Sequence, residues 1–195
     1  MTVRINKPAF NIREKLTELK HKPIELVSVE TPEITTSGTN SYRIEGIHET
    51  DHPIYFRLNG TSVGTTNNNQ YIRLGIEKGS VLNTAIYYWT SAYAGDSASV
   101  SAQSGNPGTE YYFANEWTNI ANQFYTMIKI QRLSTNSNNY FMQMMGIANP
   151  GWSAYLYHSC CRVELGAPLY SIQLASGSNF DGGSISVQYI YERNL

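Results

Sequence analysis

Residues 168–192 read PLYSIQLASGSNFDGGSISVQYIYE, and two runs within this segment alternate between apolar and polar side chains. The apolar members are Tyr170, Ile172 and Leu174 in the first run and Ile185, Val187, Tyr189 and Tyr191 in the second. Alternation with a period of two indicates a β-strand with one face buried and the other facing water. Residues 176–183, between the runs, are rich in Ser, Gly, Asn and Asp, which turn the chain or accept a positive φ. The pattern predicts two consecutive strands, joined either as a closing β-hairpin or as a short connection between two sheets.

The composition of the whole chain agrees with this strand pattern. Its 195 residues are enough for one domain with a sizeable core. Charged residues make up 15%, below the roughly 25% that is usual in globular domains, while Tyr and Gly each occur 15 times. Low charge combined with many β-forming and turn-forming residues indicates an all-β architecture.

Short strand-like runs continue from residue 24 to the end of the chain. Before the closing pair, the predicted strands cover residues 24–29, 42–47, 53–59, 71–76, 84–90, 124–133, 140–146 and 154–165. Asn59-Gly60 is interpreted as a hairpin turn, and residues 94–109 as a long loop that is either mobile or functional. Many short strands with regular turn clusters predict a β-sandwich or a barrel.

The first 23 residues have a different pattern. Asn11 and Glu14 fit a capping box at the start of a helix that Pro23 ends. The apolar side chains are Val3, Ile5 and Phe10 in an extended arm, then Ile12, Leu16 and Leu19 on one helix face. A helix of about ten residues is shorter than the ~12–15 residues that are marginal alone in water, so this face must pack on something. It packs either on its own domain or on another molecule, where six such side chains would supply several kcal/mol of gross burial at ~25 cal/mol per Å².

Residues 48–52, His-Glu-Thr-Asp-His, match the H-E-x-x-H pattern of zinc peptidases. That chemistry needs a helix that places both histidines on one side, one turn apart. Gly46 precedes the motif and Pro53 follows it, with strand-like runs on both sides. We therefore expect a loop, with no metal and no catalytic role.

Charge and hydropathy argue against several classes of function. The net charge of −1 provides no basic field for nucleic acid. No apolar run approaches the roughly 20 residues that span a bilayer, and the N-terminus lacks the apolar core of a signal peptide. We expect a soluble product made in the cytoplasm, with no membrane insertion. No catalytic constellation and no cofactor motif is recognisable.

Two adjacent cysteines, Cys160 and Cys161, point to opposite faces if they lie on a strand. We interpret them as small hydrophobic residues in or near a sheet; a vicinal disulfide or half of a metal site is the alternative. Two cysteines cannot make a disulfide framework for a chain of this length.

An aromatic cluster provides the best candidate for a ligand surface. It comprises Tyr87, Tyr88, Trp89, Tyr93, Tyr111, Tyr112 and Trp117. Aromatic side chains stack on sugar rings and dominate protein interfaces, but at strand spacing half of them should face the core. Core packing, a subunit contact and a glycan site all remain open for Tyr87, Trp89, Tyr93, Tyr112 and Trp117.

Two segments resemble virion proteins of marine tailed phages, cyanophages among them. Residues 3–19, VRINKPAFNIREKLTEL, resemble the N-terminal segment of such proteins, and residues 170–189 are similar to the end of a β-rich phage domain. The runs 42–47 and 54–58 also suit that domain. The ending departs from the usual pattern, because residues 189–192 read YIYE and the chain continues beyond the usual stop. The resemblance carries no catalytic residues.

The resemblance implies a non-enzymatic virion structural protein: a capsid decoration, a head fibre or a short tail fibre. We expect a jelly-roll-like β-sandwich over residues 24–195, docked on phage capsid or tail proteins through residues 1–23. Ordering the N-terminal arm opposes docking, so we expect avidity from an oligomer, with a trimer as the favoured state. The alternative is a carbohydrate-binding module that recognises host surface glycans through the aromatic cluster.

Overall fold

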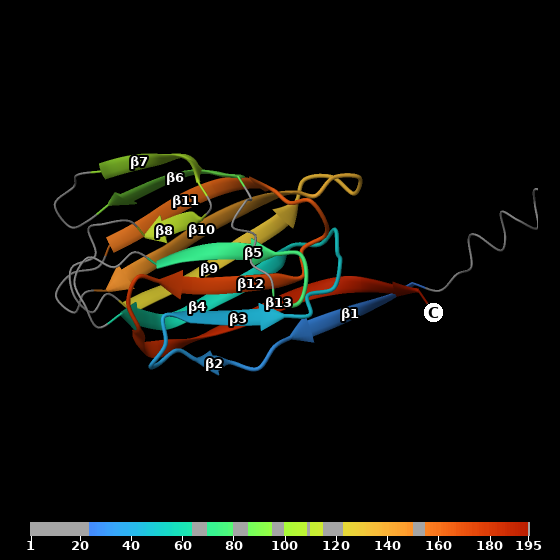
Figure 1. Ribbon diagram of the computed structural model, residues 1–195, viewed down its shortest axis with the longest axis horizontal. Helices are drawn as coiled ribbons and strands as arrows, with labels where there is room; N and C mark the ends of the chain where they lie inside the picture. Colours follow the sequence, from blue (N-terminus) through green and yellow to red (C-terminus); the bar gives the residue numbers. More distant parts are fainter. Residues whose placement is uncertain are drawn as a thin grey trace, which may run out of the picture.

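A computed structural model describes residues 24–63, 70–79, 86–94, 100–108, 110–114, 123–149 and 155–194. In this part of the chain there are thirteen β-strands and no helix. The strands form two antiparallel sheets that pack face to face, with the smaller sheet nearer the viewer in Figure 1. The predicted all-β sandwich is confirmed. The helix predicted before Pro23 lies outside the described residues.

The larger sheet has nine strands and the smaller sheet has four. In spatial order the larger sheet contains β1 (Ile24–Glu30), β13 (Phe180–Asn194), β4 (Ile54–Val63), β9 (Gln123–Arg132), β10 (Asn139–Asn149), β11 (Tyr155–Glu164), β6 (Ile86–Ala94) and β7 (Val100–Gly108), with β2 (Ile34–Thr35) also paired to β13. The smaller sheet contains β3 (Ser41–Glu45), β12 (Ser171–Ser176), β5 (Gln70–Gly75) and β8 (Tyr111–Ala114).

Eight strands of the fold, counting β1 and β2 as one, pair in a nested order. The β1–β2 edge pairs with β13, β3 with β12, β4 with β9, and β5 with β8. First thus pairs with last, and so on inward, as in a long hairpin rolled into two sheets, which is the topology of a jelly roll. Two further hairpins, β6–β7 and β10–β11, interrupt this order. They add to the larger sheet beside β9 and widen it by four strands.

Alternating side chains from both sheets fill the space between the layers. Phe56, Ile128 and Val187 of the larger sheet and Ile72 and Leu174 of the smaller sheet are fully buried. As the sequence pattern predicts, the even-numbered apolar positions of β9 point inward and its odd-numbered positions point outward.

Three buried tyrosine hydroxyls connect the two layers. The Tyr87 hydroxyl on β6 accepts a 2.7 Å hydrogen bond from the backbone N–H of Leu74 on β5. The hydroxyl of Tyr111 on β8 is hydrogen-bonded to Ser159 Oγ on β11. Tyr140 on β10 accepts a 3.0 Å bond from the N–H of Leu169, just before β12. Burial raises the pKa of each of these three phenols, so they stay neutral and tie the sheets together.

The closing segment crosses from one sheet to the other. β12 lies in the smaller sheet and β13 in the larger one, so the cross-sheet alternative is correct and the closing hairpin is not. The expectation of a wet face is wrong for β12, since all six of its residues are buried, Ser171 and Gln173 included. β12 is a central strand, with β3 on one side and β5 on the other.

Two loop assignments are also corrected. Gly60 lies inside β4, where its φ of 68° and a shift in register produce a bulge in place of the predicted hairpin turn. Gly183 (φ 94°) on β13 lies directly beside it, and a Cβ there would be 2.4 Å from the carbonyl carbon of Gly60. Most of the loop predicted over residues 94–109 is the edge strand β7.

Candidate interaction surfaces

The His48–His52 segment is an irregular loop between β3 and β4, as the flanking Gly46 and Pro53 predict. The His48 ring stacks on Tyr191, with 4.2 Å between ring centroids and 13° between planes. Its backbone N–H donates to the Tyr189 hydroxyl at 3.1 Å, and Thr50 Oγ1 donates to the Ile190 carbonyl at 2.6 Å. The loop therefore works as a support for the last residues of β13.

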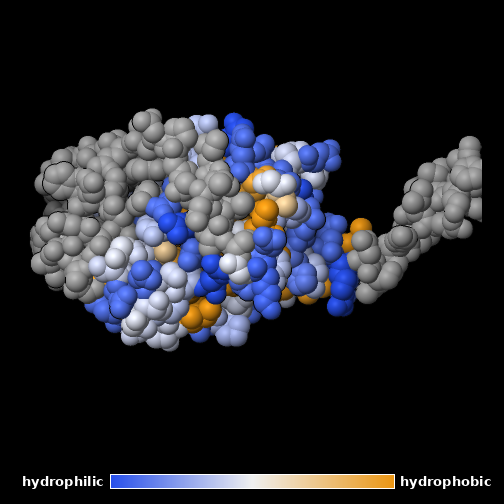
Figure 2. Space-filling view, viewed as in Figure 1, coloured by the Kyte–Doolittle hydropathy of each residue, from blue (hydrophilic) through white to orange (hydrophobic). Residues whose placement is uncertain are grey.

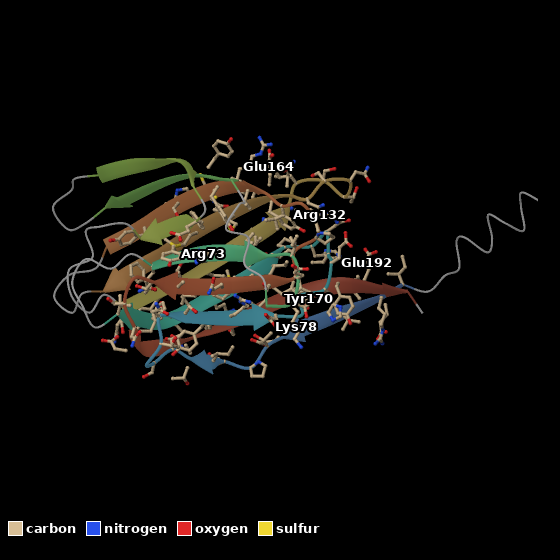
Figure 3. All side chains as sticks on the ribbon, viewed as in Figure 1. Arg73, Lys78, Arg132, Glu164, Tyr170 and Glu192 are labelled. Carbon is tan, nitrogen blue, oxygen red and sulfur yellow. The ribbon has the colours of Figure 1, made fainter. Side chains whose placement is uncertain are left out.

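Arg132, at the end of β9, holds the same loop from the other side. Only 9% of its side chain is exposed, and its guanidinium lies 2.5 Å from Glu49 Oε1 and 3.6 Å from Asp51 Oδ1. Its Nε donates to the Ser137 carbonyl at 2.7 Å. Arg132 and the two carboxylates border a pocket of about 220 Å³ that Glu192 also lines, and Figure 3 shows Arg132 and Glu192 at the same end of the molecule. The guanidinium neutralises the carboxylates, and among the described residues no group of three His, Cys, Asp or Glu side chains is placed to hold a metal ion.

A two-stranded ribbon extends from this end of the sandwich. Pairing between β13 and β4 stops at Gln188, whereas β13 continues to Asn194 with β1 as its partner. Figure 1 shows β1 and β13 running out together toward the C-terminus. An isolated two-stranded ribbon is marginally stable in water, which explains why the His48–His52 loop must brace it.

One side of this terminal ribbon exposes three apolar side chains among polar ones. Ile24, Leu26 and Ile190 are 57%, 62% and 40% exposed. Ile24 is the residue at which the N-terminal segment joins the sandwich. The six docking residues predicted in that segment, Val3, Ile5, Phe10, Ile12, Leu16 and Leu19, lie outside the described residues.

The structure separates the members of the predicted aromatic cluster. Tyr87 and Tyr111 are fully buried between the two sheets, whereas Tyr88 is 48% exposed. Tyr87 is therefore a core residue and cannot contact a glycan. Trp89 and Tyr93 lie on β6, where their backbones pair with Cys161 and Tyr157. Tyr112 lies on β8. The side chains of Trp89, Tyr93 and Tyr112, and all of Trp117, lie outside the described part of the structure.

The adjacent cysteines lie on β11 and behave as the strand geometry predicts. Cys161 points into the core and is 1% exposed, while Cys160 on the opposite face is partly exposed. No disulfide joins them. Burial raises the pKa of the Cys161 thiol, which keeps it protonated and unreactive.

The outer face of the smaller sheet is polar. Arg43, Gln173 and Arg73 are cross-strand neighbours on β3, β12 and β5. Arg73 is ion-paired with Glu110, and its guanidinium lies 4.9 Å from the Tyr71 ring centroid. Figure 2 shows that hydrophilic residues prevail among the described atoms on this side. The two arginines are already ion-paired with Glu45 and Glu110, and Gln173 between them is buried, so this face offers no unpaired charge from these residues.

The outer face of the widened larger sheet carries a cluster of exposed apolar side chains. We use the term apolar face for five exposed residues on β9, β10 and β11: Tyr125, Met127, Met145, Ile147 and Leu156. Tyr125 pairs with Ile147, which pairs with Leu156, and Met127 pairs with Met145, so the five side chains are contiguous. The sequence alternation gave the outward direction of Tyr125 and Met127 but not this patch, because its members come from three separate strands. Apolar residues occur at both even and odd positions of 140–147, which was the one sign in the sequence that both faces of this strand are apolar.

None of the comparisons with protein families, with curated proteins and with solved structures found a match for this chain. Within the described residues, no helix has the length and apolar character to cross a membrane.

Proposed function

We propose that this chain is a non-enzymatic structural protein of a tailed-phage particle, which docks through residues 1–23 and presents the β-sandwich outward. The observation that supports this best is the terminal ribbon. Residues 24–194 carry a two-layer core, and the N-terminal segment joins them at the tip of a ribbon at one end. A docking segment attached there leaves both sheet faces clear of the particle.

The bracing of the ribbon fits a mechanical role. A load on residues 1–23 passes directly to β1 and then to β13, because these strands pair from Ile24–Asn194 to Glu30–Gln188. The stacked His48 and the Thr50 hydrogen bond hold β13 at the point where β4 no longer pairs with it. His48 and Thr50, which belong to the segment that matches the H-E-x-x-H pattern, thus have structural partners.

Deletion of residues 1–23 tests the docking role. We expect a folded, soluble sandwich that no longer joins the particle, measured by circular dichroism and by mass spectrometry of gradient-purified particles. An unfolded product would instead place the segment in the core of the domain. A finer pair of variants is Leu16→Asp, on the apolar stripe of the predicted helix, and Thr17→Asp, which adds the same charge at the next residue. Only Leu16→Asp should lower incorporation.

The number of copies per particle decides between positions on it. Copies comparable to the major shell protein, or a simple fraction of it, would indicate a capsid decoration. A few copies per particle would indicate a head or tail fibre, and absence from particles would refute the structural role.

The glycan-binding alternative now depends on Trp89, Tyr93, Tyr112 and Trp117, since Tyr87 is buried. Separate replacement of Trp89 and Trp117 by Ala tests it on a glycan array. Loss of binding with an unchanged melting curve would favour a site, whereas a collapsed melting curve would favour core packing.

A further inference from the structure

The apolar face lies where polar side chains are expected. Outward positions of a solvated sheet alternate with the core positions and are normally polar. Here Met145 is 67% exposed, Leu156 53% and Ile147 48%. Scattered exposed hydrophobic residues need no explanation, but a contiguous patch indicates an interaction site. From this face we infer that a second copy of the chain packs on it, with the larger sheets of two subunits face to face.

The extent of the face fits a subunit contact. Five side chains about half exposed present roughly 500 Å² of apolar surface, near the largest patch that a monomer usually carries. Arg57 and Asn59 pair with Met127 and Tyr125, and His158 pairs with Met145, so these three residues border the face and would add to the contact. The total then approaches the ~800 Å² per partner of a standard interface.

The shape of the surface favours a two-fold contact. Beside the apolar face is a hollow of about 310 Å³, floored by the short side chains of Ser184 and Ser186 on β13 and walled by Met127 and Glu33. Strand order across the sheet is β13, β4, β9, β10, β11, so the hollow and the exposed side chains of Met145 and Leu156 lie on opposite sides of β9. A two-fold axis parallel to the strands above β9 therefore sets these exposed side chains of each copy over the hollow of the other. Such self-complementarity is what an isologous dimer requires.

The same axis fixes which charges meet. Glu33 of one copy lies toward His158 of the other, across the hollow. Lys129, two residues from Met127 on β9, faces Lys129 of the second copy, because a residue on the axis meets its own symmetry mate. This repulsion limits the affinity and gives the arrangement a distinctive salt dependence: screening tightens the dimer. An acidic partner on this face would instead be released by salt. The proposal gives a dimer in place of the trimer expected from the sequence, and it stands independently of the particle role.

Sedimentation equilibrium of the full chain tests the proposal. We expect twice the subunit mass of 21.9 kDa at micromolar concentrations. Met145→Lys should raise the dissociation constant at least tenfold. Leu133→Lys is the matched control: Leu133 is 54% exposed but lies in the β9–β10 turn, and its replacement should leave the dimer intact. Melting temperatures verify that both variants fold.

Lys129→Gln and added salt test the position of the axis. Both should tighten the dimer severalfold. A monomer at 100 µM, a trimer, or a dimer that Met145→Lys does not weaken would overturn the proposal. A dimer weakened by Lys129→Gln would overturn the axis above β9. Failure here leaves particle incorporation untouched, because that role is read from the deletion of residues 1–23.

Discussion

Removal of one hydroxyl, in Tyr87→Phe, should loosen the connection between the two sheets. The ring is 0% exposed, and its oxygen accepts the backbone N–H of Leu74 at 2.7 Å. The pairing of β8 with β5 ends at Ile72, so it does not reach Leu74. The Tyr87 hydroxyl accepts the hydrogen bond from the Leu74 N–H instead. Phenylalanine keeps the packing but leaves this donor buried without an acceptor, which costs ~1–3 kcal/mol. For a domain of this size, a loss of about 2 kcal/mol lowers the melting temperature by ~4–8 °C.

Urea unfolding followed by tryptophan fluorescence measures this loss, at one protein concentration so that association does not change the midpoint. The matched control is Tyr88→Phe on the adjacent residue, where the side chain is 48% exposed and the expected change is below ~0.5 kcal/mol. The m-value should be the same for both variants. If Tyr87→Phe were as stable as Tyr88→Phe, the Leu74 N–H would not depend on the phenol, and the Tyr87 hydroxyl would not stabilise the contact between the sheets.

Three other predictions follow from the described geometry. Burial raises the pKa of Tyr87 and Tyr111 above the usual value of 10.0, so the folded protein keeps protons that the unfolded chain releases, and the free energy of unfolding should fall as pH rises above about 10. The double variant Tyr87→Phe/Tyr111→Phe should show a shallower fall between pH 9 and 11, and an equal slope would assign the alkaline loss to other groups. Gly183→Ala should destabilise by more than ~3 kcal/mol, because its Cβ would meet the Gly60 backbone at 2.4 Å, whereas Gly79→Ala, with a similar positive φ but open space, should cost only ~1–2 kcal/mol in thermal melts; equal costs would contradict the close approach of β4 and β13. Calorimetric titration with Zn²⁺ should give no stoichiometric heat from residues 48–52, since His48 is stacked and Glu49 is ion-paired; one tight site abolished by His48→Ala would refute this.

Local patterns predicted the strands well wherever one side of a strand meets the core. The alternation of Phe124, Ile128 and Ile130 with Tyr125 and Met127 is seen in the burial of β9. The adjacent cysteines likewise divide between the two faces of β11. Such patterns report only which way a side chain points, because they depend on the two-residue period of a strand.

The pairing of strands and the features that depend on it were not readable in this way. The sequence pattern missed β7 because its Gly and Pro residues resemble a loop, and an edge strand tolerates Pro107 since one side of its backbone needs no partner. Gly60 looked like a turn because a bulge and a turn both use a positive φ. The apolar face could not be predicted, because it exists only after β9, β10 and β11 lie side by side.

The position of β13 also determines when the protein can fold during its synthesis. This strand is the last described segment of the chain, yet it lies between β1 and β4, near the middle of the jelly-roll half of the larger sheet. Until the ribosome has released it, β4 exposes an unpaired edge and β1 lacks the strand with which it pairs. Contacts such as Val27 with Tyr191 join the two ends of the domain, so folding is expected to be slow and to wait until β13 has left the ribosome. Loss of even the final fifteen residues would remove a central strand, and a chain terminated early would be a substrate for aggregation or proteolysis.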